Sequence, residues 1–476
     1  MKKIALLIAA VLLVSGCSQE YTAEKAFWKA RTELKKVKKS DIATGKVEVL
    51  DPSIRDFQKI ADRFPGTSKA AESLFVVVNL KIMEKKYDEA HQTLTKIIQN
   101  YSGIGTNAPE ARDGIARLYE VQGDWAKAEQ AYWELAEYHP LSEKGLQAPI
   151  NVLVHYQKVK DAAKAQIAYD KAVDFYERTL KQVGPIQAST SVKNGLAVTH
   201  LTFGEWRKAL EAWKSIARDF PNSPGAPIAT LAAAELAMKK QEFSTAAELY
   251  QGYLEKYKKH FLFQQALMQT ARIYAQMKQF AESRKYLDQL RELQKKDSPY
   301  LPQIDLMQGQ SFQEEGQWAE ADKIYEKILM QYPKSASALQ VSFYRSQYYE
   351  AHGDAARSKT ELDKAITRAM ELAQGDNKSV AAFADRMLNV AYAQKGEWSK
   401  VLANFEENMR NEMNPARKGG WLFLQAVITE NRIGDKAGAL ALYKDFITQY
   451  PIHPLTKQAK ARVEALSKLP KTEPAV

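Results

Sequence analysis

The feature that most constrains this chain is an aromatic residue that returns at a near-constant interval, each time after a short polar turn. These residues are Tyr87, Trp125, Trp206, Phe243, Phe280, Trp318 and Trp398. The gaps between them are mostly 37 or 38 residues, or about twice that. A fixed period of this size is typical of arrays in which one supersecondary unit stacks on copies of itself. The sequence therefore predicts a repeat protein, in which length is no guide to the number of domains.

One unit is clearest between Gly123 and Pro140, which reads GDWAKAEQAYWELAEYHP. After the turn, Ala128, Tyr132 and Leu135 follow at spacings of three, four and seven, which places them on one face of a helix. Gly123 suits the left-handed C-cap of a preceding helix, and Pro140 ends the second helix because it cannot donate a helical hydrogen bond. The pattern predicts a pair of helices closed by a proline. The same stop recurs at Phe64-Pro65, Phe220-Pro221, Tyr332-Pro333 and Tyr450-Pro451.

These units resemble the tetratricopeptide repeat (TPR) family. Three units carry its signature in full: Gly123, Trp125, Ala128, Tyr132 and Pro140; Gly204, Trp206, Ala209, Trp213 and Pro221; Gly309, Gly316, Trp318, Ala321, Tyr325 and Pro333. The resemblance implies an all-α, right-handed superhelical solenoid of about eleven TPR-like helix pairs over residues 22–468. A final helix, Leu455–Lys468, would cap it, and residues 469–476 would form a flexible tail. Most units exceed the family's usual 34 residues, which leaves the superhelical pitch open.

A second-order repeat is also present. A shift of 193 residues lays Trp125 on Trp318 and brings the two longest units into register, ahead of Trp206 and Trp398. We interpret this as duplication of a block of several units. Chance alignment within a repetitive sequence is the alternative.

The N-terminus predicts a lipoprotein signal peptide. Lys2 and Lys3 precede eleven apolar residues, 4–14, a run shorter than the roughly 20 that span a bilayer. It ends Val14-Ser15-Gly16-Cys17, which is similar to a bacterial lipobox, and Cys17 is the only cysteine. We expect residues 1–16 to be removed, Cys17 to carry lipid (diacylglycerol and a palmitate-type chain), and 17–21 to be a short tether. An ordinary signal peptide with an accidental cysteine is the alternative.

The resemblance to bacterial lipoproteins implies a cell-envelope location. Ser18 stands where an aspartate would favour the inner membrane, so we expect a lipid-anchored protein of the outer membrane that faces the periplasm. The style of the units is similar to periplasmic TPR proteins of outer-membrane assembly and of the Tol-Pal system. With its single cysteine acylated, the mature chain would have no internal disulfide.

The charge balance does not point to nucleic acid as a partner. The formal net charge is +11, and the only dense basic run is Lys35-Lys36-Val37-Lys38-Lys39, close to the expected anchor. We interpret this run as a solvated helix face, with attraction to anionic lipid head groups as the alternative.

The sequence offers no catalytic or metal-binding motif. No two of the seven histidines lie three or four residues apart, and one acylated cysteine leaves no thiolate site. Neither a glycine-rich phosphate loop nor a G-x-S-x-G motif is present. We therefore expect a binding protein with no cofactor and no metal, rather than an enzyme.

In TPR arrays the first helix of each pair lines the concave surface. Alignment to the Trp125 unit places charged residues at some inner positions: Glu110, Asp113, Arg117, Glu235, Arg272 and Arg386. Later units turn apolar, and these residues are the candidate partner-binding positions for a helix or an extended peptide: Leu306, Phe343, Phe383, Trp421 and Leu424. Packing between helices is the alternative. The Lys/Asn clamp by which chaperone-binding members hold a C-terminal carboxylate is absent.

The recurring aromatics are predicted to be buried repeat core rather than a sugar-stacking surface: Trp125, Trp206, Phe243, Phe280, Trp318 and Trp398. The expected function is that of a membrane-anchored scaffold for protein–protein interactions in the bacterial envelope, serving an outer-membrane, pilus or secretion, or polysaccharide-export complex. The alternative is a peptidoglycan- or glycan-binding periplasmic lipoprotein, which would need aromatic and polar groups exposed together in the groove.

Overall fold

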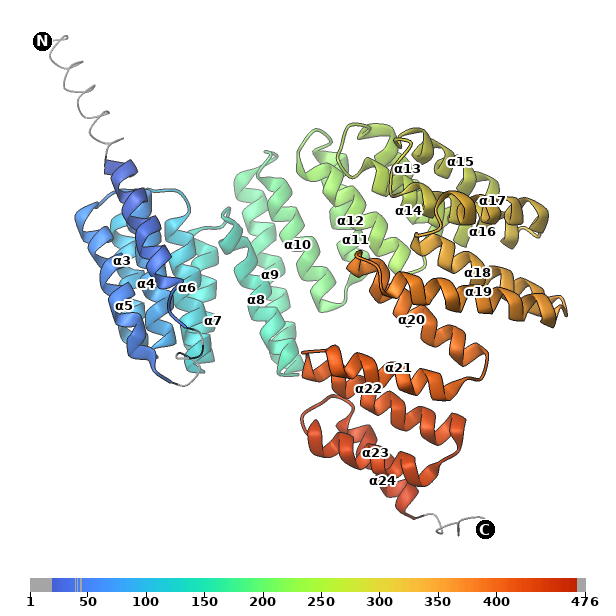
Figure 1. The fold of residues 1–476 in the computed structure, drawn as a ribbon. Coiled ribbons are helices and arrows are strands. Elements are labelled where there is room, and N and C mark those ends of the chain that lie inside the picture. Colours follow the sequence, from blue (N-terminus) through green and yellow to red (C-terminus); the bar gives the residue numbers. More distant parts are fainter. Residues whose placement is uncertain (1–18, 39, 41, 43–44, 469–476) are drawn as a thin grey trace, which may run out of the picture. The chain divides into compact units, whose positions relative to one another are not determined.

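The computed structural model describes residues 19–38, 40, 42 and 45–468, and in these residues all regular structure is helical (Figure 1). The all-α prediction is confirmed. The chain divides into two units, residues 1–266 and 267–476, which are described separately. The predicted signal peptide, Cys17 and the C-terminal tail lie outside the described residues. No described helix is both long enough and apolar enough to span a membrane.

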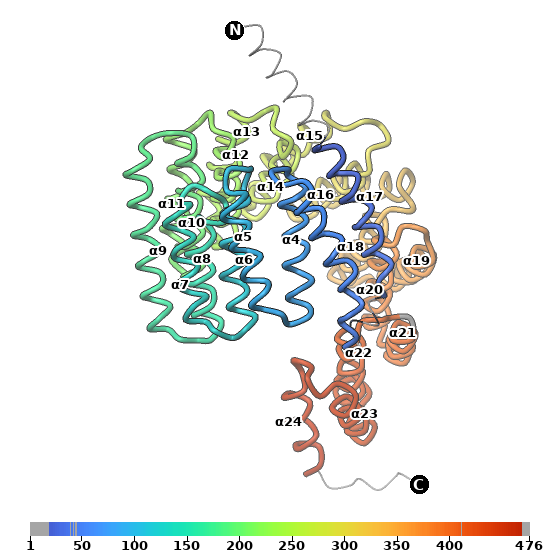
Figure 2. The backbone as a smooth tube through the Cα atoms, turned by 90° about the vertical axis from the view of Figure 1, so that its left-hand side faces the viewer, coloured from blue at the N-terminus to red at the C-terminus, as the bar shows by residue number. Residues whose placement is uncertain are grey.

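The first unit consists of consecutive helices, each packed on the next (Figure 2). Residues 19–34 form its first helix, and a short 3-10 turn, η1 (Val47–Leu50), precedes α3. The remaining helices are α3 (Asp51–Arg63), α4 (Ser68–Met83), α5 (Tyr87–Tyr101), α6 (Asn107–Gln122), α7 (Trp125–Tyr138), α8 (Glu143–Lys158), α9 (Ala162–Val183), α10 (Ser189–Phe203), α11 (Trp206–Asp219), α12 (Gly225–Lys239) and α13 (Phe243–Lys256).

The second unit continues in the same way, and α14 (Phe263–Gln276) begins just before its boundary. Its other helices are α15 (Phe280–Glu292), α16 (Leu301–Glu314), α17 (Trp318–Gln331), α18 (Ala336–Ala351), α19 (Ala355–Ala373), α20 (Lys378–Gln394), α21 (Trp398–Asn411), α22 (Pro415–Ile428), the π-helical turn η2 (Thr429–Ile433), α23 (Lys436–Gln449) and α24 (Thr456–Ser467).

The described helices therefore form eleven pairs with α24 as a last single helix, which confirms the predicted pairing. The first helices of neighbouring pairs also contact one another: α4 with α6, α6 with α8, α8 with α10, and α10 with α12 in the first unit, and α16 with α18 and α18 with α20 in the second. These first helices thus form one layer of each unit and the second helices the other. The two long repeats owe their length to the second helices, since α9 has 22 residues and α19 has 19.

In ten of the eleven pairs, all but the first, the turn between the two helices has one backbone shape, whether or not it contains glycine. Six turns place a glycine in the left-handed region, with φ from +72° to +107°: Gly123, Gly204, Gly316, Gly353, Gly396 and Gly434. Four turns place a residue with a side chain there, with φ from +57° to +62°: Lys85, Lys160, Gln241 and Lys278. The N–H of the next residue then bonds to the carbonyl five residues before it, as Asp124 N does to Tyr119 O and Asp161 N to Tyr156 O. The exception is Asp435 N, which follows the π-helical turn η2 and bonds to Thr429 O, six residues before it. The weaker repeats keep the geometry of the strong ones at the cost of local strain.

The recurring aromatics, predicted to be buried repeat core, are less buried than expected. Trp125, Trp206, Phe243, Phe280, Trp318 and Trp398 are all partly exposed. In three of these repeats the fully buried ring stands seven residues later, at Tyr132, Tyr250 and Tyr325. The physical reason is position, because a residue at the start of a second helix lies over the turn, whereas one seven residues later lies on the same face at mid-helix.

Two of these aromatics link one repeat to the next. The ring of Trp125 lies flat on His155 of α8, with centroids 3.3 Å apart and planes 3° from parallel. Trp318 lies in the same way on Tyr348 of α18, at 3.5 Å and 1°. Both tryptophans also pack against buried cores, so their contacts connect a second helix to the first helix of the following pair.

Candidate partner-binding groove

A groove of about 1590 Å³ opens on the layer of first helices in the second unit. Its walls come mainly from α14, α16, α18 and α20 and from the loops that precede α16, α18 and α20, with further contributions from α15 (Phe280 and Ser283) and the end of α17 (Gln331). We call it the unit-2 groove. A smaller groove of about 510 Å³ lies on α8, α10 and α12 of the first unit and is called the unit-1 groove. Both lie on the helix layer where the TPR resemblance places partner binding.

The sequence of α16 explains how it faces both a core and the groove. Gly309 packs against the ring of Tyr325, and a Cβ added there would lie 2.5 Å from that ring, so only glycine allows this approach of α16 to α17. Gln303, Met307 and Gln310 recur at spacings of four and three, which places them on one face, and all three line the groove. One face of the helix is thus fixed by packing while another remains available.

The groove carries an excess of positive charge. Its lining contains five cationic side chains, Arg272, Lys278, Lys296, Lys334 and Arg386, and two anionic ones, Asp297 and Glu314. None of the seven forms an ion pair with any other residue that the structure describes.

Other arginines of the same unit are paired. Arg284 contacts Glu315 at 2.8 Å, and Arg345 contacts Asp322 at 2.9 Å. Cations without an ion pair to a described residue also occur outside the groove, for example Lys359 and Arg410, so the groove is distinguished by having five of them in one lining.

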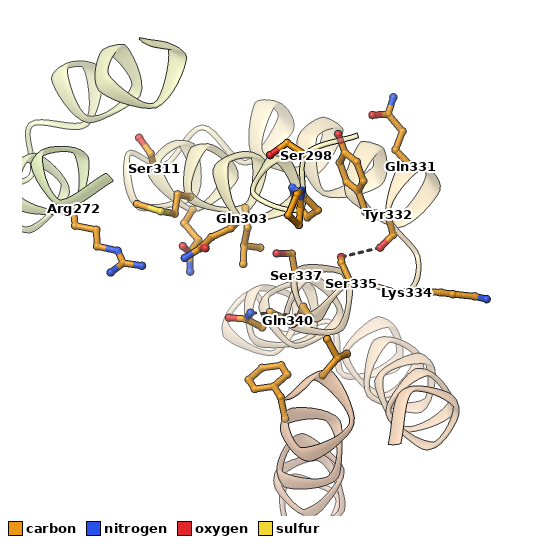
Figure 3. A pocket seen from close by; sticks show the side chains of 18 of the residues that line it. Arg272, Ser298, Gln303, Ser311, Gln331, Tyr332, Lys334, Ser335, Ser337 and Gln340 are labelled. Atoms are coloured by element: carbon orange, nitrogen blue, oxygen red, sulfur yellow. Dashed lines mark hydrogen bonds between the residues drawn. The ribbon is translucent and has the colours of Figure 1, made fainter. Parts of the chain in front are cut away.

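Amide and hydroxyl groups supply most of the remaining polar surface. The lining includes Gln276, Gln303, Gln310, Gln331, Gln340, Asn377 and six serines. Figure 3 shows Arg272, Gln303, Ser337 and Gln340 around one open space, whereas Lys334 and Gln331 point away from it. The amide of Gln303 makes no hydrogen bond within the described part of the chain, and Gln340 makes only long ones of 3.4 and 3.5 Å. Several donors and acceptors therefore remain available to a ligand.

Phe383 of α20, one of the candidate partner-binding residues, lies in the wall of this groove. It is half-buried and lines the wall, with the guanidinium of Arg386 5.9 Å from its ring centroid. Leu306 also borders the groove but is only 4% exposed. The structure thus brings together Arg272, Leu306, Phe383 and Arg386, which come from three different first helices.

The interpretation of Leu306 and Phe343 as exposed contact residues is wrong. Both are 4% exposed: Leu306 packs with Tyr325, and Phe343 packs with Leu362 and does not line the groove. Repeat alignment identifies the inner helix but does not separate its groove-facing stripe from the adjacent stripe that packs on neighbours, which is the alternative stated for these residues.

Trp421 and Leu424 lie on α22, away from the unit-2 groove. Trp421 is half-buried and Leu424 is 45% exposed, and neither belongs to the lining. Sequence reasoning overlooked the glutamines Gln303 and Gln310, although a detectable signal existed. Polar residues at helical spacing on the inner helix of a repeat are not needed for packing and therefore mark an open face.

The unit-1 groove has a different character. Leu141 and Ile228 in its lining are 45% and 47% exposed, and Glu143 is its only charged residue. Its lining is mainly apolar, with uncharged polar side chains from Gln147, Thr190, Ser191 and Asn194 and one acidic group. The two grooves differ in charge although both lie on first helices.

The described residues contain no group of three or more side chains suited to a metal ion. Burial lowers the pKa of His155, which lies under Trp125, and of His200, which bonds to the hydroxyl of Tyr169 at 2.9 Å. Both histidines are part of the packing between repeats and lie outside the two grooves.

Comparison with known proteins agrees with this architecture. Residues 186–344 match the family model described as a tetratricopeptide repeat-like domain, so this third of the chain is a TPR-like domain. Curated protein sequences include no match to the chain.

Solved structures similar to the chain include several TPR proteins. Yeast Tom70 is 10% identical over 94% of this chain and 96% of its own, with a TM-score of 0.39. A tetratricopeptide repeat protein from Parabacteroides merdae is 15% identical over 58% of this chain and 98% of its own, with a TM-score of 0.30. The quorum sensor NprR from B. thuringiensis is 12% identical over 73% and 99%, with a TM-score of 0.32.

Proposed function

We propose that this protein is a lipid-anchored scaffold that binds protein partners in the bacterial cell envelope through the unit-2 groove. The observation that carries the proposal is the groove itself: an open space on the first helices, lined by unpaired charges and amides beside the partly exposed ring of Phe383. Polar groups that the fold does not use are typical of a recognition surface. TPR-like repeats are suited to this role because a stack of helix pairs presents a continuous concave surface.

The lipobox at Val14–Cys17 supports the envelope location. The helix over residues 19–34 begins two residues after Cys17. At about 3.3 Å per extended residue, this spacing would hold the first repeat within roughly 10 Å of an acylated Cys17 and so of the bilayer surface. Cys17→Ser should therefore move the protein from the membrane fraction to the soluble fraction. A variant that still sediments with membranes would contradict the anchor.

Crosslinking in intact cells tests partner binding at the groove. A photo-crosslinking amino acid in place of Gln303 should give a protease-sensitive adduct of defined mass, because position 303 lies in the groove wall. The same amino acid in place of Lys359, an exposed residue outside the groove, is the control and should give none. Absence of a protein adduct at position 303, or equal adducts at both positions, would contradict the proposal.

The second candidate is a glycan- or peptidoglycan-binding lipoprotein. It is favoured by one observation, the presence of aromatic and amide side chains together in the unit-2 groove. In that case the protein would sediment with purified peptidoglycan, and Phe383→Ala would abolish sedimentation while the crosslinker at position 303 gave no protein adduct.

A further inference from the structure

We infer that the unit-2 groove takes an acidic segment of a partner protein in an extended conformation. This inference rests on the proposed function, since it names the chemistry of the partner at the same groove. Three observations carry it: the unpaired cations, the amides that make no hydrogen bond or only long ones, and the contrast with the unit-1 groove.

The lining of the unit-2 groove is positively charged. Five cations against two anions give the lining a formal excess of three positive charges, although one of the five, Lys334, points away from the open space (Figure 3). Arg272 enters from α14 and Arg386 from α20, so charge is supplied from both ends of the set of helices that form the walls. Neither forms an ion pair with a residue in the described ranges. A basic segment would be repelled, and an apolar helix would take water from these cations without replacing it, which is unfavourable. A ligand with several carboxylates satisfies them.

The polar side chains of the groove are suited to the backbone of an extended peptide. Each residue of an extended peptide presents an N–H and a C=O that need partners when water is excluded, whereas a helix satisfies its own. Gln303, Gln340 and Ser337 come from α16 and α18 and lie around the same open space (Figure 3). An amide side chain both donates and accepts, so Gln303 and Gln340 can pair with both groups of a peptide backbone. The amides thus favour an extended segment over a helical one.

The unit-1 and unit-2 grooves differ in the charge of their linings. The unit-1 groove has the same kind of helix as its walls but holds no cation, and Glu143 would repel an acidic ligand. An acidic segment therefore has a preferred site on this chain, and the fold alone does not create that preference.

The test measures binding of a fluorescein-labelled dodecapeptide of Asp, Glu, Gly and Ala to the full lipidated chain in detergent. Binding is detected by fluorescence anisotropy. Two peptides of equal length serve as comparisons, one with Asn and Gln in place of the acids and one with Lys. We expect the acidic peptide to bind about tenfold or more tightly than the neutral one, and to lose affinity as salt is raised. Equal binding of the acidic and neutral peptides, or tighter binding of the Lys peptide, overturns the inference.

Paired substitutions locate the binding. Arg272→Glu with Arg386→Glu should weaken binding of the acidic peptide by about tenfold or more, because the charge of two of the five groove cations is reversed. Lys359→Glu with Arg410→Glu changes the net charge equally at exposed positions outside the lining and should have less than about a threefold effect, since distant charges are screened. All four residues are exposed, so the melting temperature should stay the same. Equal weakening by both pairs overturns the inference, because it would show attraction to net charge alone.

The outcomes separate this inference from the proposed function. A protein adduct at position 303 together with no preference for the acidic peptide refutes the acidic segment and leaves the scaffold intact. Sedimentation with peptidoglycan that depends on Arg272 and Arg386, with no peptide binding, refutes both in favour of a glycan ligand.

Discussion

Replacing Lys160 with glycine should stabilise the first unit. Lys160 occupies the turn between α8 and α9 with φ +61°, in the left-handed region that side chains disfavour. Its side chain is exposed and makes no ion pair with a described residue, so the substitution removes only strain. A left-handed residue with a Cβ costs about 1–2 kcal/mol. Glycine loses roughly 0.4–1 kcal/mol more backbone entropy on folding, which leaves a net gain of about 0.5–1 kcal/mol.

The neighbouring turn offers the matched reverse substitution. Gly123 has φ +79° in the preceding repeat, and a Cβ added there would meet no atom within 4 Å. Gly123→Ala therefore introduces backbone strain without a clash and should destabilise by about 0.5–1 kcal/mol. Because both turns are solvated, neither substitution should alter the groove of the second unit.

Both effects are measured by unfolding with urea and with heat, and by hydrogen exchange. A change of this size should move the melting temperature by about 1–4 °C in a unit of this length. Amides of α8 and α9 should exchange more slowly in Lys160→Gly, and those of α6 and α7 faster in Gly123→Ala. A Lys160→Gly protein that is less stable than the parent, or a neutral Gly123→Ala, would refute the left-handed turn as the common element of these repeats.

Three further predictions concern the packing between helices. Trp318→Ala removes the ring stacked on Tyr348 and should destabilise the second unit by about 2–3 kcal/mol in urea unfolding, less than a fully buried ring would, since the indole is partly exposed. Arg345→Met removes the cation that pairs with Asp322, and burial already raises the pKa of this carboxyl group. The substitution should lower the free energy of unfolding by about 2–3 kcal/mol. Adding Asp322→Leu to the same protein should restore most of this loss. Burial lowers the pKa of His200 below 6.5, so the unfolded chain takes up the proton first as pH falls. The contribution of neutral His200 to the free energy of unfolding should be fully present above pH 6.5 and decline below it. In urea titrations at pH 7.5 and 5.5, His200→Gln should show a smaller loss of stability between the two pH values.

Much of the fold follows from the sequence because helix pairs are governed by local rules. Period, turn and proline stop determine where α7, α11 and α17 begin and end, and each of these helices ends two residues before its proline. The burial of single side chains did not follow, as Trp318 and Phe343 show. Both depend on how one repeat lies on the next, which involves contacts between residues far apart in the sequence, and helical spacing within one repeat does not encode the angle between two repeats.

The groove was harder to predict because its residues are those the fold does not require. A shift of 193 residues lays Glu110, Asp113 and Arg117 of α6 on Gln303, Leu306 and Gln310 of α16.

In α6 the side chains at these positions are neutralised by ion pairs. The carboxylate of Asp113 is buried and meets Arg117 at 2.8 Å and the ammonium of Lys144 at 3.4 Å. In α16 the central position is a buried leucine and the flanking glutamines line the unit-2 groove. Because the same register on the same scaffold yields an internally neutralised face in one repeat and an open polar face in the other, partner choice on this chain depends on residues that packing leaves free to vary.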